Sequence, residues 1–197
     1  MKRIVIALLL VLIASSAAAQ TIYDIQTGLV AEDTVVQLQN VTVVATRYNG
    51  FFVAEAPFGM YNGIWVYADA DLGFAAGDVV NIEGKYYEYF DLSEVDVTAG
   101  QVQPVGSGPV PAPSVVPAAV LLDPATAEPW ESCAVTIPDM GYVASLPSQF
   151  GEWDVDYGGS LLLFDDFWYD DSTVLVGDCY QAVTGIIYFA FGSFRMN

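Results

Sequence analysis

Aromatic side chains in the predicted strands are the first candidates in this sequence for ligand binding. The stretches GFFVAE (50–55) and GIWVYAD (63–69) carry them in the first half, and later stretches repeat the pattern. Rings on the outer face of a strand stack on bases or sugars, at about 1–3 kcal/mol per stacked base. Because strand side chains alternate between two faces, the same rings also suit a packed barrel interior. The candidate ligand-binding residues are Phe52, Trp65, Tyr67, Trp153 and Trp168.

Carboxylates gather in two short runs, YADADLG (67–73) and FDDFWYDDS (164–172). Grouped carboxylate oxygens are the ligands that Ca²⁺ takes outside cells, so Ca²⁺ is the candidate cofactor. Two alternatives stay open, a solvated acidic loop and a pair of acids that serve a glycosidase. The candidate metal ligands are Asp69, Asp71, Asp165, Asp166, Asp170 and Asp171.

The N-terminus predicts export. Lys2 and Arg3 precede an apolar run over 4–14, and Ala17 and Ala19 stand in the small-x-small arrangement of a signal peptidase site. We therefore predict a signal peptide over residues 1–19 and a secreted protein, periplasmic or extracellular. A retained anchor is the alternative, but the run is shorter than the roughly 20 residues of a membrane helix. We expect no transmembrane segment.

Two cysteines and the absence of histidine limit the chemistry further. In an exported chain an even pair of cysteines forms a disulfide, so we predict a bridge between Cys133 and Cys179. Without histidine the commonest general base and the commonest zinc ligand are missing. A Ser-His-Asp or Cys-His hydrolase is thereby excluded on this chain, and we predict no catalytic residue.

The charge is strongly acidic, with 24 Asp and Glu against five Lys and Arg and a formal net charge of −19. A field of this sign repels phosphate backbones and therefore disfavours nucleic acid as a partner. It suits divalent cations, basic partners, or solubility alone.

The elements that must position these residues are short strands, rich in β-branched and aromatic residues and separated by glycine-containing breaks. In the first half we predict strands over 35–46, 50–55, 63–69, 78–90 and 92–97. In the second half we predict them over 133–143, 151–158, 160–169, 178–191 and 193–197. Between the halves, residues 103–117 are rich in Pro and Gly and predict a linker, and 118–132 has room for a short helical turn.

The two halves match in order, which indicates an internal duplication. GFFVAE aligns with GEWDVD, and NVTVVA (40–45) aligns with CAVTIP (133–138). AGDVVNIEG (76–84) aligns with VGDCYQAVTG (176–185), where the final glycines, Gly84 and Gly185, lie inside long strands. A residue without Cβ there permits the bend that closes a barrel.

We therefore predict an all-β fold of two tandem five-stranded OB-like Greek-key barrels after a signal peptide. The first barrel spans 20–102 and the second spans 118–197. A two-sheet sandwich that runs through both halves is the rival architecture, which the prolines between the halves disfavour.

These runs resemble a known family. VTVVATRYNGFFVAE, GIWVYA and AGDVVNIEGKYYEYFDLSEV are similar to the OB-fold module that precedes the endonuclease/exonuclease/phosphatase domain of secreted bacterial nucleases. EPWESCAVTI, GEWDV and GDCYQAVTGIIYFAFGSFRMN resemble the second OB unit that often follows in the same proteins. The resemblance covers most of 21–197 and implies tandem OB modules associated with an extracellular nuclease. The nuclease domain itself is not part of this sequence.

The expected function is a secreted, non-catalytic binding or accessory module with tandem OB folds. Its ligand would be nucleic acid, a glycan or a protein, and the charge disfavours the first of these. The alternative is an acidic extracellular structural or adhesion protein tuned by Ca²⁺. The runs YYEYF (86–90) and YFAF (188–191) predict barrel wall and packing between the halves.

Overall fold

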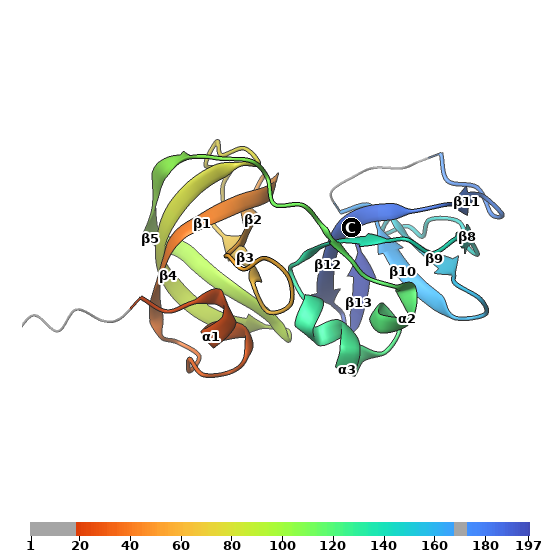
Figure 1. The fold of residues 1–197 in the computed structure, drawn as a ribbon, viewed down its shortest axis with the longest axis horizontal. Helices are drawn as coiled ribbons and strands as arrows, with labels where there is room; N and C mark the ends of the chain where they lie inside the picture. The colour runs from red at the N-terminus through yellow and green to blue at the C-terminus, as the bar shows by residue number, and fades with distance from the viewer. Residues whose placement is uncertain (1–18, 168–172) are drawn as a thin grey trace, which may run out of the picture.

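The computed structural model describes residues 19–167 and 173–197, and most of their regular structure is β-strand (Figure 1). Two lobes lie side by side, the first lobe built from β1–β5 and the second lobe from β6–β13. The predicted all-β class is thereby confirmed. Within the described ranges, no helix combines the length and the apolarity that crossing a membrane requires.

The first lobe is a closed barrel with the strand order β1-β2-β3-β5-β4. Paired neighbours are antiparallel, except that β3 and β5 run parallel. This arrangement matches the five-stranded Greek-key barrel predicted from the sequence. Its strands are β1 (Val35–Arg47), β2 (Gly50–Ala54), β3 (Gly63–Tyr67), β4 (Asp78–Tyr89) and β5 (Leu92–Ser107).

In the described residues the second lobe is an eight-stranded sheet with the order β11-β8-β9-β10-β13-β12-β7-β6, and not the closed five-stranded barrel predicted for 118–197. Its pairings repeat those of the first lobe with two strands broken, because residues 138–140 separate β7 from β8 and 181–182 separate β11 from β12. As with β3 and β5, strands β10 and β13 run parallel. The strands are β6 (Ser114–Val115), β7 (Ala134–Ile137), β8 (Gly141–Val143), β9 (Glu152–Asp156), β10 (Leu161–Asp165), β11 (Cys179–Tyr180), β12 (Val183–Ala190) and β13 (Ser193–Met196).

A short helical segment precedes β1 in the first lobe and β7 in the second, and each segment adds side chains to the core of its lobe. In the first lobe Ile22 and Ile25 of α1 (Ile22–Gln26) are buried among the barrel residues. The second lobe has three short turns in the predicted segment 118–132, and they add Ala118, Leu121 and Ala127 to its core. These turns are α2 (Ala118–Leu121), α3 (Pro124–Ala127) and the 3₁₀ turn η1 (Glu128–Trp130).

The repeated Gly-Asp motif forms the same turn in both lobes. Gly77 and Gly177 have left-handed backbones, with φ of +95° and +94°. In each copy the following aspartate, Asp78 or Asp178, accepts a hydrogen bond from the backbone N–H three residues earlier, at 2.9 Å. The motif therefore builds the entry to β4 and to β11, as the duplication predicts.

Gly84 and Gly185 are required by close backbone approach. A Cβ at Gly84 would lie 2.7 Å from the backbone oxygen of Asp96, and one at Gly185 would lie 2.1 Å from that of Asn197. In β4 the pairing to β5 also shifts register between Glu83 and Lys85, around this glycine. The bend expected in the long fourth strand is therefore present in the first lobe, and both glycines serve close packing.

The predicted alignment of the first strands is wrong. Val36 pairs with Gly84, and Val135 pairs with Gly185, so Val36 and Val135 occupy equivalent positions. NVTVVA therefore does not correspond to CAVTIP. An alternating pattern fits a strand at several registers, and only its pairing with the fourth strand selects one.

The linker is shorter than the predicted 103–117. Strand β5 continues to Ser107 and stays paired with β4 despite containing Pro104. Because β3 pairs only with residues 94–96, this part of β5 is an edge, where proline is tolerated. Val116 is already buried in the second core, which leaves residues 108–113 as the connection.

Candidate functional site

The second lobe covers the face of the first lobe on which we predicted ligand binding. Phe52 and Trp65 are 0% and 3% exposed and lie in an apolar cluster with Leu92 and with Ile186 of β12. The ring of Phe52 also meets that of Tyr188 edge-on, with centroids 6.2 Å apart. Apolar burial between the lobes therefore removes the Phe52 ring from solvent, where the prediction had placed it on a binding face.

Polar contacts hold the same junction. Gly63, at the start of β3, touches the second lobe so closely that a Cβ would lie 2.2 Å from the backbone oxygen of Ser132. The backbone N–H of Ser93 donates to Glu131 Oε1 at 3.0 Å. Burial raises the pKa of Glu131 to about 8. The two lobes are thus joined by a tight contact that includes a buried carboxyl group.

Beside this buried junction an open groove encloses about 560 Å³, and we call it the inter-lobe groove. The first lobe contributes β3, β4 and β5 to its walls. The second lobe contributes β12 and residue 167, which follows β10. Aromatic rings from both lobes line it: Trp65, Tyr67, Tyr87, Tyr89, Phe167 and Tyr188.

Glu94 is the buried carboxylate of the inter-lobe groove, at 8% exposure. It lies on β5 and pairs with Trp65 on one side and with Tyr87 on the other. Burial and the nearby charge of Asp96 raise the pKa of Glu94 to about 7. Across residues 19–167 and 173–197, Glu94 makes no hydrogen bond or ion pair. The groove therefore contains an acid whose charge nothing in the described chain compensates.

Positive charges already touch the rims of the groove through ring faces. Phe167 stacks on Tyr188 with centroids 5.4 Å apart and planes at 19°, and the Arg47 guanidinium lies over the Phe167 ring. The Lys85 ammonium lies 4.8 Å from the Tyr87 centroid. Ring faces attract cations through their quadrupole. The walls of the groove are therefore suited to a cation as well as to an apolar group.

The second lobe carries the opposite charge at the position equivalent to Glu94. Arg195 pairs with β10 and β12 as Glu94 pairs with β3 and β4. Arg195 is 2% exposed, and its guanidinium donates to Glu152 and, at 3.0 Å, to Asp165. The second lobe thus neutralises its own acids with an internal cation, whereas the first lobe presents an acid among rings.

The other predicted aromatic residues have different places. Trp153 is 6% exposed inside the second lobe, with its ring 5.8 Å from that of Phe164. It occupies the inward-facing side of β9 and packs in the core of the second lobe, away from the inter-lobe groove. Trp65 and Tyr67 line the inter-lobe groove, although Trp65 presents little surface. Trp168 lies outside the described residues.

The described members of the predicted Ca²⁺ set do not converge. Asp69 and Asp71 accept hydrogen bonds inside their own loop. Asp165 forms an ion pair with Arg195, and Asp166 is the residue after Asp165. Within the part of the chain that the structure describes, no group of three or more acidic or Cys side chains is placed to hold a metal. Asp170 and Asp171 lie outside that part, and Ca²⁺ binding stays a prediction.

The predicted disulfide is absent, and both cysteines are free thiols. Cys133 is buried at the junction, where its Sγ donates to the backbone oxygen of Gly59 at 3.1 Å. Cys179 is exposed on β11 and pairs with Tyr142 of β8. Cys133 directly precedes β7 and Cys179 starts β11. Strand β11 pairs with β8, which residues 138–140 separate from β7. Similar positions in the strand pattern therefore did not imply proximity.

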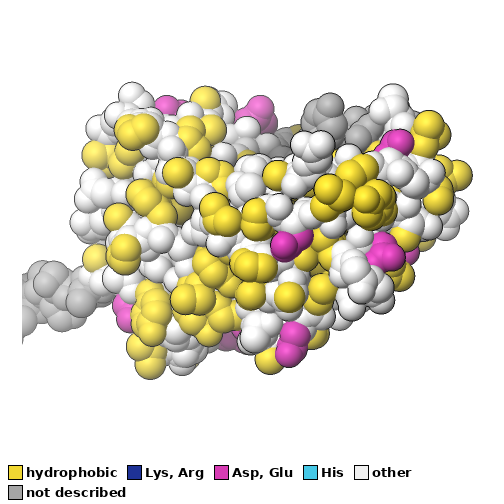
Figure 2. All heavy atoms as spheres, turned by 45° about the vertical axis from the view of Figure 1, so that its right-hand side comes forward, with side chains coloured by type: hydrophobic (Ala, Val, Ile, Leu, Met, Phe, Trp, Pro, Cys, Tyr) yellow, Lys and Arg dark blue, Asp and Glu magenta, His cyan; other side chains and the backbone are white. Residues whose placement is uncertain are grey.

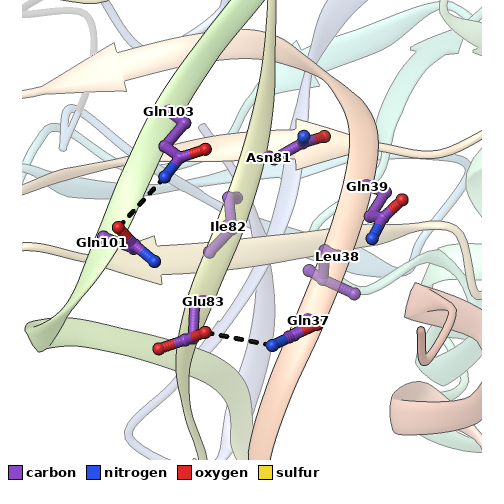
Figure 3. A pocket seen from close by; sticks show the side chains of 8 residues that line it. All are labelled: Gln37, Leu38, Gln39, Asn81, Ile82, Glu83, Gln101 and Gln103. Carbon is purple, nitrogen blue, oxygen red and sulfur yellow. Dashed lines mark hydrogen bonds between the residues drawn. The ribbon is translucent and has the colours of Figure 1, made fainter. Parts of the chain in front are cut away.

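A second hollow, of about 150 Å³, lies on the first lobe over β1, β4 and β5 (Figure 3). Carboxamide side chains line much of it. Gln37 of β1 donates to Glu83 of β4 at 3.0 Å, and within β5 Gln103 donates to Gln101 at 3.1 Å. The first of these is a cross-strand pair, which stabilises a sheet. Because this hollow is small, lacks aromatic lining and holds amides that already bind one another, the inter-lobe groove is the better candidate site.

Sequence reasoning missed the main residues of the groove. Tyr87, Tyr89 and Tyr188 were assigned to barrel wall and packing, and Glu94 was not singled out. The stretch LSEVDV also contains Ser93 and Asp96, so the local pattern did not set Glu94 apart. The other half of the site could not be found locally, because Tyr188 comes from the second lobe.

No protein-family model and no curated protein matches this chain. A solved structure described as "Structural mimicry for functional antagonism" is 12% identical, with a TM-score of 0.38, and the match covers 84% of this chain and 88% of that chain. Another, described as "Molecular basis for abrogation of activation of pro-inflammatory cytokines", is 12% identical, with a TM-score of 0.39. That match covers 85% of this chain and 91% of that chain. Superpositions this loose support no conclusion about this chain.

Proposed function

We propose that this chain is a secreted, non-catalytic binding module whose ligand site is the inter-lobe groove. The observation that carries the proposal is the groove itself, about 560 Å³ with six aromatic rings and a buried carboxylate that has no partner among the described residues. Ligand pockets typically enclose about 300–1,000 Å³, with a mostly apolar lining and a few polar groups. The groove has this size and composition.

The side chains near the groove support binding over catalysis. The sequence has no histidine, so the commonest general base is missing. Burial raises the pKa of the Cys133 thiol to about 11, which keeps it protonated and unreactive at neutral pH. Glu94 and Asp96 both line the groove, and the described residues that line it with them include no Ser, Thr, Cys or Lys side chain.

The charge supports a ligand other than nucleic acid. The formal charge of the sequence is −19, and Figure 2 shows acidic side chains among apolar ones with no Lys or Arg on the face drawn. Single-strand binders combine ring stacking with a basic groove, and this groove is acidic. A glycan or a protein partner fits better. The resemblance to modules of secreted nucleases supports an accessory role beside such an enzyme.

Binding titrations followed by intrinsic fluorescence and calorimetry test the proposal. The panel contains maltohexaose as a neutral glycan, an arginine-rich peptide and single-stranded DNA. We expect at least one of the first two to bind, and the double variant Tyr87→Ala/Tyr89→Ala to weaken that binding at least tenfold. Two stacking rings at about 1–3 kcal/mol each account for such a loss.

The matched control is Tyr142→Ala, which removes an exposed tyrosine from β8 of the second lobe. It should bind as the unmodified protein does. Binding that the groove variant leaves unchanged, or turnover of a bound ligand, would contradict the proposal.

A further inference from the structure

The carboxylate of Glu94 is the feature of the groove that its own chain leaves incomplete. It is 8% exposed, lies between Trp65 and Tyr87 in the sheet, and has no hydrogen-bond or ion-pair partner in the described ranges. A buried carboxylate is costly unless it is paired, because burial removes the water that solvates its charge. A ligand that supplies a positive charge would remove that cost.

The cations of the described chain are engaged elsewhere. Lys85 pairs with Asp33 at 2.6 Å, and Arg195 pairs with Glu152 and Asp165 in the second lobe. Arg47 lies over the rings of Tyr48 and Phe167. These three are the Lys and Arg residues of the described ranges, so a counter-ion for Glu94 would have to come from outside them.

The second lobe shows which cation suits this position. At the place equivalent to Glu94 it holds Arg195, whose guanidinium bonds two carboxylates from neighbouring strands. A guanidinium is planar, stays charged at neutral pH and stacks on aromatic faces, and an ammonium lacks the planar face. The inter-lobe groove offers the complementary surroundings, with acids at the base and rings on the walls.

We propose that the inter-lobe groove binds an arginine side chain of a basic partner protein, with the Glu94 carboxylate as its counter-ion and the rings of Tyr87 and Tyr188 as its walls. This inference rests on the proposed binding function and names the ligand chemistry of the same site. The acidic charge of the whole chain adds long-range attraction for a basic partner.

The proposal predicts a pH dependence. Because burial raises the pKa of Glu94 to about 7, a proton competes with the guanidinium for this carboxylate. Affinity should therefore rise about tenfold from pH 6 to pH 8, as the ionised fraction of Glu94 grows. Among the described residues, the titratable and charged groups that line the groove with Glu94 are Asp96, Glu88, Tyr67, Tyr87, Tyr89 and Tyr188. Lys85 lies over the Tyr87 ring, and Arg47, Arg195 and Asp165 act on Tyr188.

Calorimetric titration of the purified protein with three matched peptides tests this. The first peptide is Ac-Gly-Arg-Gly-Arg-Gly-NH₂, the second replaces arginine with lysine, and the third replaces it with citrulline, a neutral isostere. We expect the arginine peptide to bind best and the citrulline peptide at least tenfold more weakly. Ethylguanidinium as a free ion is a separate arm, and it should bind more weakly than the peptide.

The variant Glu94→Gln removes the charge and keeps the shape. It should lose at least tenfold in affinity for the arginine peptide and should lose the pH dependence. The matched control Glu32→Gln removes one exposed carboxylate from the loop before β1 and should change the affinity less than twofold. A thermal melt of each variant verifies its fold.

Three results would overturn the inference. The first is equal binding of the citrulline and arginine peptides, the second is unchanged affinity in Glu94→Gln, and the third is no binding of any cationic probe at millimolar concentration. Binding of maltohexaose that depends on Tyr87 and Tyr89 would then leave the proposed binding function standing. Tighter binding of free ethylguanidinium than of the peptide would assign the groove to a small organic cation and not to a protein.

Discussion

The two lobes share a pattern of strand pairing, a Gly-Asp turn and a helical segment before β1 or β7. They carry opposite charges at one equivalent position of the sheet. The second lobe has Arg195 at the position where the first lobe has Glu94. Arg195 forms an ion pair with Glu152 of β9, whereas the first lobe has Gly50 at the equivalent position of β2. The same framework thus forms a self-neutralised core region in one copy and an open, acidic, ring-lined groove in the other.

This difference suggests how a duplicated domain can divide its tasks. The second lobe covers the aromatic face of the first with Ile186 and Tyr188, and in doing so it supplies one wall of the groove. Neither lobe alone contains the site. Variants at the equivalent positions should therefore have opposite effects, and the predictions below follow from the largest expected effect to the smallest.

Replacing Arg195 should destabilise the protein most. Arg195→Met leaves Glu152 and Asp165 without their buried counter-ion, so we expect a loss of about 3–5 kcal/mol in the free energy of unfolding. Urea denaturation measures it. The triple variant with Glu152→Gln and Asp165→Asn should recover most of the loss, and a loss below 1 kcal/mol in the single variant would show that the ion pairs contribute little.

The equivalent glycines should behave alike in both lobes. Gly84→Ala and Gly185→Ala place a Cβ against backbone oxygens, so each should cost about 1–3 kcal/mol, the usual cost of overpacking. Gly106→Ala is the control, because a Cβ there meets nothing within 4 Å. If one lobe tolerated the methyl group and the other did not, the two bends would not be equivalent.

The buried carboxyl at the junction should make stability depend on pH. The pKa of Glu131 is about 8 in the folded protein against 4.5 for an ordinary glutamate, so the folded state binds more protons between these values. Stability therefore falls as the pH rises through this window. Glu131→Gln should remove about 1–2 kcal/mol of the difference between pH 5 and pH 8, at 1.36 kcal/mol per pKa unit with allowance for relaxation. Thermal melts at both pH values measure the effect. If stability changed equally between pH 5 and pH 8 in the variant and in the unmodified protein, the prediction would be contradicted.

Replacing Glu94 should have the opposite sign to replacing Arg195. Glu94→Gln removes an unpaired buried charge, so at pH 8 we expect a gain of about 0.5–1 kcal/mol, less than the full value of a raised pKa because the groove admits water. At pH 5, where Glu94 is protonated, the gain should vanish. Denaturation at the two pH values measures both. A destabilisation at pH 8 would mean that Glu94 has a partner in the free protein.

Much of the fold could be predicted because strand patterns and breaks are local. The predicted 50–55 and 63–69 agree with β2 and β3 to within two residues at each end. Pro104 misled the prediction, since an edge strand accepts a proline that a central strand rejects. The predicted disulfide is absent for a related reason. Cys133 and Cys179 both lie near the start of a strand, and this does not determine the distance between them.

The sequence by itself determined the all-β class, the places of β2 and β3 and the acidic charge, since each depends only on residue types and their spacing. Tertiary structure alone decided which rings meet solvent and which lie between the lobes. Phe52 is covered and Tyr188 becomes a wall of the groove because the second lobe docks on the outer face of the first. Tertiary structure also decided that the Glu94 side chain is buried with no partner among the described residues. An alternating strand has two faces, and only the packing of other elements determines which face is buried and which binds a ligand.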